Sequence, residues 1–197
     1  WANTFRAYWV NRGATYYAIE NIVDGHMFDA IWSLADNFRV QWLDTSYYAT
    51  PGGTANSDAN YNSISCDVRF GTYDFIMCGD LPSAPEDQLA SNYASNQFIG
   101  AGNTVVYKAC HHCSKTANSA TFLAFIQPTY AWASAGIESG NTSPTATKSE
   151  QHPYKEPRAR IETYTTAARM WWNGTAGTLI MNIPADSSSF SIRGVGR

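Results

Sequence analysis

The sequence lacks the features that would mark a membrane protein, a strongly basic nucleic-acid-binding protein or a disulfide-built scaffold. Only 15% of its 197 residues are charged, and the formal net charge is −3, whereas a protein that grips nucleic acid through a basic face should be positive. No apolar run reaches the ~18 residues needed to cross a bilayer, so we expect no membrane span. Four cysteines are too few to hold a fold together by disulfide bridges.

The start of the chain also lacks a secretory signal peptide. The first residues, from Trp1 onward, form neither a basic nor an apolar leader region. We therefore expect a processed product, a fragment of a polyprotein or a portion of a longer chain. The apolar share of 44% is ample for one core, and no linker separates two self-sufficient halves, so residues 1–197 are expected to form a single domain.

Alternation of apolar and polar residues is the main structural signal. It is clearest in residues 62–70, where it predicts a strand with one buried face. Residues 24–37 and 83–96 have helical spacing instead, and Ser83 with Glu86 looks like a capping box. Together with the resemblance described below, these patterns imply strands at residues 4–10, 16–23, 39–43, 62–78, 104–110, 121–127, 158–172 and 178–184. Many short strands with about two short helices predict a mainly β fold, an antiparallel two-sheet sandwich.

The densest group of reactive side chains is Cys110, His111, His112 and Cys113. A redox dithiol would need a helix directly after it, whereas residues 114–119 read as a loop. A zinc site would need further ligands, because four adjacent residues cannot easily supply a tetrahedral shell alone. The third alternative is that Cys110 and Cys113 form a structural disulfide bridge or remain plain thiols. We expect neither a bound metal nor a cofactor.

The other two cysteines suggest a disulfide. If residues 71–73 turn a hairpin, Cys66 and Cys78 lie opposite each other on its two strands. The alternative is a pair of buried thiols that behave as small apolar residues.

The remaining candidates for function are surface contacts. Trp171 and Trp172 are adjacent in a predicted strand, so their side chains point to opposite faces and one of them is expected to meet solvent or a partner. Lys155, Arg158 and Arg160 form a basic cluster that is a candidate nucleic-acid contact, with a solvated face as the alternative. The carboxylates are scattered, and neither a nucleophile elbow nor a phosphate-binding loop is present, so we expect no enzyme.

The order of these strands and helices resembles the jelly-roll coat proteins of small non-enveloped viruses. The low charge and the many neutral polar and aromatic residues are similar too, and a Trp start without a basic arm looks like a picorna-like subunit cut from a polyprotein. The resemblance implies eight strands in two sheets, with loops 50–60 and 134–157 on the outer or inter-subunit surface.

In function, the resemblance implies a structural capsid subunit located in the virion. Such a subunit would assemble with copies of itself or related coat subunits through neutral, aromatic surfaces, with encapsidated nucleic acid and a host receptor as further partners. Two alternatives remain open. One is a secreted or virion-surface β-sandwich that binds glycans or a receptor through exposed Trp and Tyr, and the other is an enzyme that uses Cys110–Cys113 or a carboxylate pair.

Overall fold

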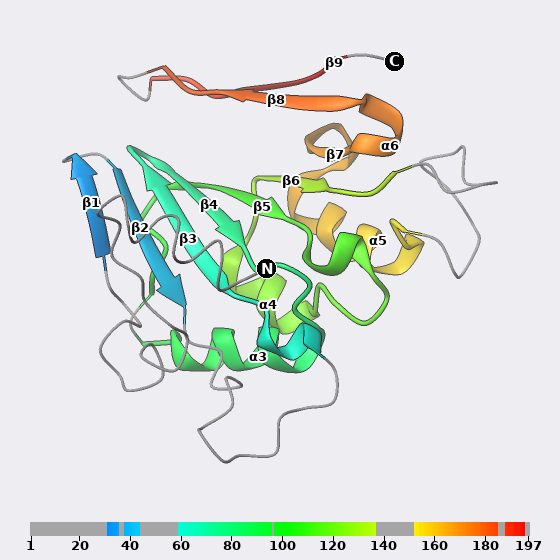
Figure 1. Ribbon diagram of the computed structural model, residues 1–197, viewed down its shortest axis with the longest axis horizontal. Coiled ribbons are helices and arrows are strands. Elements are labelled where there is room, and N and C mark those ends of the chain that lie inside the picture. The colour runs from blue at the N-terminus through cyan, green and yellow to red at the C-terminus, as the bar shows by residue number, and fades with distance from the viewer. Residues whose placement is uncertain are drawn as a thin grey trace, which may run out of the picture.

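The central feature of the fold is a mixed β-sheet. The computed structural model describes residues 31–35, 38–43, 59–95, 97–136, 152–184 and 188–195. Within these residues the sheet has seven strands in the order β1-β2-β3-β4-β5-β6-β7 (Figure 1). Strands β1 to β4 pair antiparallel, whereas β4 to β7 pair parallel. The strands are β1 (Ile31–Ala35), β2 (Phe38–Leu43), β3 (Ser65–Phe70), β4 (Tyr73–Met77), β5 (Thr104–Lys108), β6 (Tyr130–Ala133) and β7 (Met170–Trp172).

The β3–β4 hairpin contains the strand predicted from alternation, but the fully buried side chains of β3 are the polar Ser65 and Asp67, whereas its apolar residues are only half-buried. Its turn passes through Gly71, whose φ of 55° suits a residue without a side chain. In the register Val68 lies opposite Phe75 and Asp67 lies opposite Ile76, so the two pairs face opposite sides of the sheet. The second strand of the hairpin, β4, then pairs with β5 and begins the parallel half of the sheet.

Helices cover one face of the sheet and enclose the core. They are α3 (Ser83–Asn92), α4 (Ala120–Ile126) and α5 (Lys155–Thr165), with a short α6 (Asn173–Ala176) after β7 (Figure 1). Tyr107 of β5 and Ile161 of α5 are fully buried in one cluster with the helical residues Leu89 and Phe122. Buried side chains of α3, α4 and α5 thus form one core with the sheet, as in other α/β proteins.

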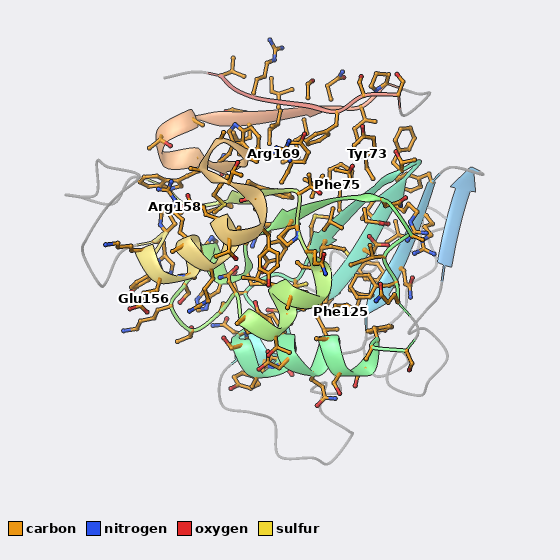
Figure 2. All side chains as sticks on the ribbon, turned by 180° about the vertical axis from the view of Figure 1, so that it is seen from behind. Tyr73, Phe75, Phe125, Glu156, Arg158 and Arg169 are labelled. Carbon is orange, nitrogen blue, oxygen red and sulfur yellow. The ribbon has the colours of Figure 1, made fainter. Side chains whose placement is uncertain are left out.

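A small antiparallel hairpin lies on the other face of the sheet. It consists of β8 (Thr178–Asn182) and β9 (Ser191–Val195). The ring of Phe190, just before β9, lies 5.6 Å from that of Tyr73 and 4.9 Å from that of Tyr130. Figure 2 shows Tyr73 and Phe75 beneath this hairpin and Phe125 on the opposite, helical side.

The prediction of a mainly β, antiparallel jelly-roll sandwich is therefore wrong. Residues 121–127 form α4 rather than a strand, because Ser119 caps a helix whose Phe122, Leu123 and Ile126 share one buried side. Residues 158–172 form most of α5 and only a short strand at their end. The buried residues of α5 are Pro157, Ile161 and Thr165, which are spaced four apart and so lie on one side of the helix.

The remaining predicted elements have mixed outcomes. The strands predicted at 39–43, 104–110 and 178–184 and the helix predicted at 83–96 are present with slightly different ends. Residues 31–35 of the predicted helix 24–37 are a strand, because they pair antiparallel with β2. The strands predicted at 4–10 and 16–23 and most of both long loops lie outside the described residues. That the chain forms one domain stays a prediction.

No helix among the described residues is long and apolar enough to cross a bilayer, as expected.

Candidate functional site

Four ionisable side chains meet at one edge of the sheet, where the parallel strands end. Asp80 follows β4, His111 and His112 follow β5, and His152 comes just before α5. In α/β sheets this carboxyl edge is where ligands bind, because the loops that leave parallel strands gather there. The position of these residues therefore makes this edge the candidate functional site.

Hydrogen bonds at Gly79 bring the ends of β4 and β5 together. The carbonyl oxygen of Gly79 accepts from the backbone N–H of His111 at 3.2 Å and from Nζ of Lys108 at 3.0 Å. Gly79 has a φ of 57°, and an added Cβ would lie 3.0 Å from Cβ of Ser63. Ser63 also accepts a hydrogen bond from the backbone N–H of Asp80 at 3.1 Å. Asp80 is thus held beside the histidine turn.

The three imidazole rings form a nearly equilateral triangle. The centroid of His111 lies 6.3 Å from that of His112 and 5.9 Å from that of His152, and the third side is 6.0 Å. Nε2 of His112 lies 3.5 Å from Oδ1 of Asp80. Three nitrogen-bearing rings and a carboxylate therefore share one small region of the sheet edge.

The backbone determines which nitrogen of His112 faces Asp80. Nδ1 of His112 lies within hydrogen-bonding distance of the carbonyl oxygen of Ser134, which follows β6. A carbonyl can only accept, so Nδ1 carries the hydrogen, and in the neutral ring Nε2 carries the lone pair. The Nε2 lone pair and the Asp80 carboxylate then face each other as two acceptors. A proton or a cation between them would satisfy both.

The turn that carries the histidines is strained. His111, His112 and Cys113 have φ values of 46°, 54° and 64°, so three consecutive residues other than glycine occupy the left-handed region. Such conformations cost on the order of 1–3 kcal/mol each and persist only where the surroundings enforce them. At this site they place two adjacent imidazoles, both half-buried, at the end of a single strand.

Both cysteines of the cluster point into the core, away from the histidines. Cys110 and Cys113 are fully buried. Burial raises the pKa of Cys113 to about 12 and raises the pKa of Cys110 well above its usual value, so both thiols hold their protons at neutral pH. A metal ligand or a redox nucleophile needs a thiolate, so the histidines are the better candidates. The structure thus divides the predicted cluster into two half-buried imidazoles and two fully buried thiols.

Cys66 and Cys78 are free thiols in this structure. The register places Cys66 opposite Met77, so Cys78 is displaced by one residue from the position directly across the hairpin. Burial raises the pKa of Cys66 to about 12. A bridge between Cys66 and Cys78 stays a prediction.

The other predicted contact residues lie outside the candidate site. Trp172 is buried, and its Nε1 donates to the carbonyl oxygen of Ala135, whereas Trp171 stacks on Tyr130 on the opposite face of the sheet. A role for Trp171 or Trp172 in surface contact stays a prediction.

The predicted basic cluster lies on α5, and two of its three side chains already bind other groups within the protein. Arg160 donates to the carbonyl oxygens of Asn118 and Ala117, and Arg158 pairs with Glu162 at 2.7 Å. Lys155 is exposed. Contact of Lys155, Arg158 and Arg160 with nucleic acid stays a prediction.

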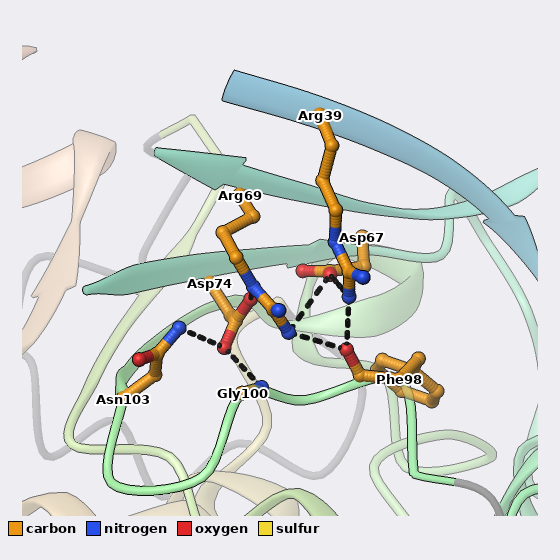
Figure 3. A network of polar contacts seen from close by, with 7 residues as sticks. All are labelled: Arg39, Asp67, Arg69, Asp74, Phe98, Gly100 and Asn103. Atoms are coloured by element: carbon orange, nitrogen blue, oxygen red, sulfur yellow. Dashed lines mark hydrogen bonds and ion pairs between the residues drawn. The ribbon is translucent and has the colours of Figure 1, made fainter. Parts of the chain in front are cut away.

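A second polar network lies at the other end of the sheet (Figure 3). Arg39 and Arg69 both donate to the carbonyl oxygen of Phe98, and each also pairs with a buried aspartate, Asp67 or Asp74. Burial raises the pKa of Asp67 to about 7, with repulsion from Asp74 as the next cause. The arginines have carboxylate partners, so we assign this network to joining the Phe98 loop to the sheet.

Sequence reasoning identified His111 and His112 but missed Asp80 and His152. Each of the missed residues stands alone in the sequence, and only the sheet topology brings it to the site. The available signal was position: Gly79-Asp80 directly follows a predicted strand, and His152-Pro153 ends a long loop.

The fold and the site define an α/β protein with a histidine-rich cluster at the carboxyl edge of its parallel strands. Within the described ranges, no three His, Cys, Asp or Glu side chains are already arranged to hold a metal ion. The arrangement therefore consists of one pair at short distance, Asp80 and His112, with two further rings close by.

Comparison with known proteins gives one partial similarity. The chain is 31% identical over 108 residues to "Competence protein ComA" of Neisseria gonorrhoeae. The match covers 54% of this chain but only 15% of that protein. No family model matches.

These findings correct the functional predictions. The relative is named a competence protein and comes from a bacterium, and the fold is mixed α/β, so a viral capsid subunit located in the virion is contradicted. The alternative, a glycan- or receptor-binding β-sandwich, has no support from the fold.

Proposed function

We propose that this chain binds a divalent transition metal, most suitably zinc, at the carboxyl edge of its parallel strands. Asp80 and His112 would be the first two ligands, and His111 and His152 would complete the set. Three imidazoles and one carboxylate are a donor set that suits zinc.

The separation between Asp80 and His112 carries the proposal. Two ligand atoms on one tetrahedral zinc ion, each about 2.1 Å from the metal, lie about 3.4 Å apart. Nε2 of His112 and Oδ1 of Asp80 are 3.5 Å apart, longer than an ordinary hydrogen bond and close to this value. The contact of His112 Nδ1 with Ser134 supports the proposal, since metal-bound histidines usually donate their second nitrogen to a backbone carbonyl or a carboxylate.

The other two histidines lie close to this pair, but their rings are farther apart than the ligands of one ion. Three imidazoles on one tetrahedral ion have ring centroids about 5 Å apart, from the zinc–nitrogen distance and the ring size. The observed separations are 5.9–6.3 Å, so the three rings would have to move closer together and turn their nitrogens toward one point to share an ion. Nδ1 of His111 is buried and has no hydrogen-bond partner among the described residues, which a metal or a bound water would supply.

If only three of these side chains bound the zinc ion, the fourth position would be open to a water molecule, and the ion would lower the pKa of that water, which is the basis of metal-assisted hydrolysis. The expectation that the protein is not an enzyme stays a prediction, and hydrolytic activity would contradict it. The partial similarity to a bacterial competence protein supports a role connected with competence, to which the metal site would contribute the chemistry.

Titration of metal-free protein with Zn²⁺ and Co²⁺ tests the proposal. We expect one metal ion per chain, and a loss of affinity of more than about 100-fold in Asp80→Asn and His112→Ala, because each variant removes a ligand. Glu156→Gln is the matched control, since Glu156 is an exposed carboxylate on α5 (Figure 2).

The spectrum of the Co²⁺ form distinguishes the ligand types. Histidine and carboxylate ligands predict no thiolate-to-cobalt charge transfer. Absence of binding, unchanged binding in both site variants, or a thiolate spectrum would contradict the proposal.

A further inference from the structure

We infer that Asn118 is the positioning residue for the histidine turn, and this inference deepens the proposed metal site, on which it rests. Asn118 lies between the strained turn and α4 and contacts neither the imidazoles nor Asp80 in any bond described above. Its side chain makes three hydrogen bonds to the strand end from which the turn begins.

The amide of Asn118 pairs with Cys110 as a second backbone would. Oδ1 accepts from the backbone N–H of Cys110 at 3.0 Å, and Nδ2 donates to the carbonyl oxygen of Cys110 at 3.1 Å. Both backbone groups of the residue before His111 are therefore fixed by one side chain. All of these atoms are buried, so a lost partner would leave a polar group without solvent to replace it.

Tyr107 makes the third hydrogen bond to this side chain and the second to its oxygen Oδ1. Its hydroxyl donates to Oδ1 of Asn118 at 2.9 Å and lies 3.2 Å from the backbone nitrogen of Cys110. Tyr107 is fully buried in β5, and its ring packs edge-on against Phe122 of α4. The hydroxyl thus connects the amide of Asn118 to a rigid strand.

A buried carboxylate and an arginine hold Asn118 in place. Glu86 of α3 accepts from the backbone N–H of Asn118 at 2.8 Å and from that of Ser119 at 2.7 Å. Arg160 of α5 donates to the carbonyl oxygen of Asn118 at 3.0 Å. Helices α3 and α5 therefore fix the backbone of Asn118, while its side chain fixes the turn.

This arrangement explains how three left-handed residues persist at the site. Asn118 itself has a φ of 62°, which asparagine tolerates better than most residues, so it can turn its amide back toward Cys110. Without that amide, the start of the turn would be free to relax, and the two imidazoles would lose their common direction. Positioning partners of this kind typically change metal affinity about 10–100-fold when removed.

Asn118→Gly tests the inference cleanly, because glycine keeps the left-handed backbone while removing the amide. We expect affinity for Zn²⁺ to fall about 10–100-fold. The matched control is Asn103→Ala, which removes a side-chain amide bonded to Asp74 at 2.9 Å at the opposite end of β5. Its affinity for Zn²⁺ should equal that of the wild type.

Two further variants separate positioning from folding. Tyr107→Phe removes only the hydroxyl and should weaken Zn²⁺ binding in the same direction. Asn118→Asp keeps Oδ1, so it should recover part of the affinity lost in the glycine variant. Wild-type affinity in Asn118→Gly, with or without loss of stability, would overturn the inference, as would an equal loss in Asn103→Ala.

A measurement without metal keeps this inference distinct from the proposed function. In nitrogen-15 NMR of the metal-free protein, we expect His112 of the wild type to carry its proton on Nδ1 and Asn118→Gly to show a mixture of tautomers. If the wild type binds no metal, the proposed function fails, and the tautomers still decide this inference. An unchanged Nδ1 tautomer in Asn118→Gly would overturn it.

Discussion

At the scale of single residues, the environment of each group decides its role more than its type does. The sequence Cys-His-His-Cys left a redox pair, a zinc site and plain thiols open, and the structure buries both thiols fully while both imidazoles are only half-buried. Glu86 shows the same effect. It looked like half of a capping box with Ser83, yet Pro82 is the N-cap of α3 and makes no side-chain cap bond, and Glu86 instead bonds two backbone amides inside the protein.

The buried position of Glu86 predicts a pH dependence of stability. Burial raises its pKa to about 7, and the bonds from Ser119 and Asn118 offset only part of this effect. Between the ordinary carboxyl pKa of about 4.3 and about 7, the folded protein holds a proton that the unfolded chain releases. Glu86 therefore contributes most to stability below about pH 4.3, and this contribution is lost as pH rises toward 7, by up to about 1.4 kcal/mol per pH unit.

Urea unfolding of the metal-free protein across this pH range checks this prediction. The pKa of Asp67 is also raised to about 7, so Asp67 lowers the free energy of unfolding over the same pH range. In Glu86→Gln, the free energy of unfolding should therefore still fall as pH rises, but less steeply than in the wild type. Glu156→Gln should keep the full slope, because Glu156 is exposed. Equal slopes in the wild type and Glu86→Gln would contradict the assignment.

At the scale of elements, local patterns predicted the strands and helices whose apolar residues have one clear period. Strand β3 belongs to this group, whereas β5 was predicted from a short apolar run, in which Val105, Val106 and Tyr107 are all buried. Residues 121–127 failed because a short run that is apolar on both sides fits a buried strand and a buried helix equally well. Residues 158–172 failed because α5 buries only Pro157, Ile161 and Thr165, a helical stripe that is too narrow and too polar to stand out.

The capping of α4 gives a prediction at this scale. Oγ of Ser119 accepts from the backbone N–H of Phe122 at 3.1 Å, so it satisfies one of the free amides of the first turn. Ser119→Ala should lower the free energy of unfolding by about 1 kcal/mol.

Chemical denaturation of Ser119→Ala beside Ser91→Ala measures this effect. Ser91 is exposed near the end of α3, and its replacement should change stability by less than about 0.5 kcal/mol. If the two variants were equally stable, Ser119 would not be acting as a cap.

At the scale of the whole molecule, the candidate site depends on strand direction. Asp80, His111 and His112 come together because β4 and β5 run parallel and end at the same edge. A prediction of antiparallel strands places consecutive strand ends at opposite edges, so it could not bring these residues together. Strand direction depends on packing between distant segments, here between α3, α4 and α5 on one face of the sheet. The alternation within a single strand does not indicate this direction.

The most direct test of the central claim is anomalous diffraction from crystals grown with zinc, measured on either side of the zinc absorption edge. We predict one anomalous peak at the carboxyl edge of the sheet, about 2.0–2.2 Å from Nε2 of His112 and from a carboxylate oxygen of Asp80. His111 and His152 should have moved toward the same peak. Absence of any peak between Asp80 and His112 at full zinc saturation, or a peak bound by Cys110 or Cys113 instead, would contradict the account.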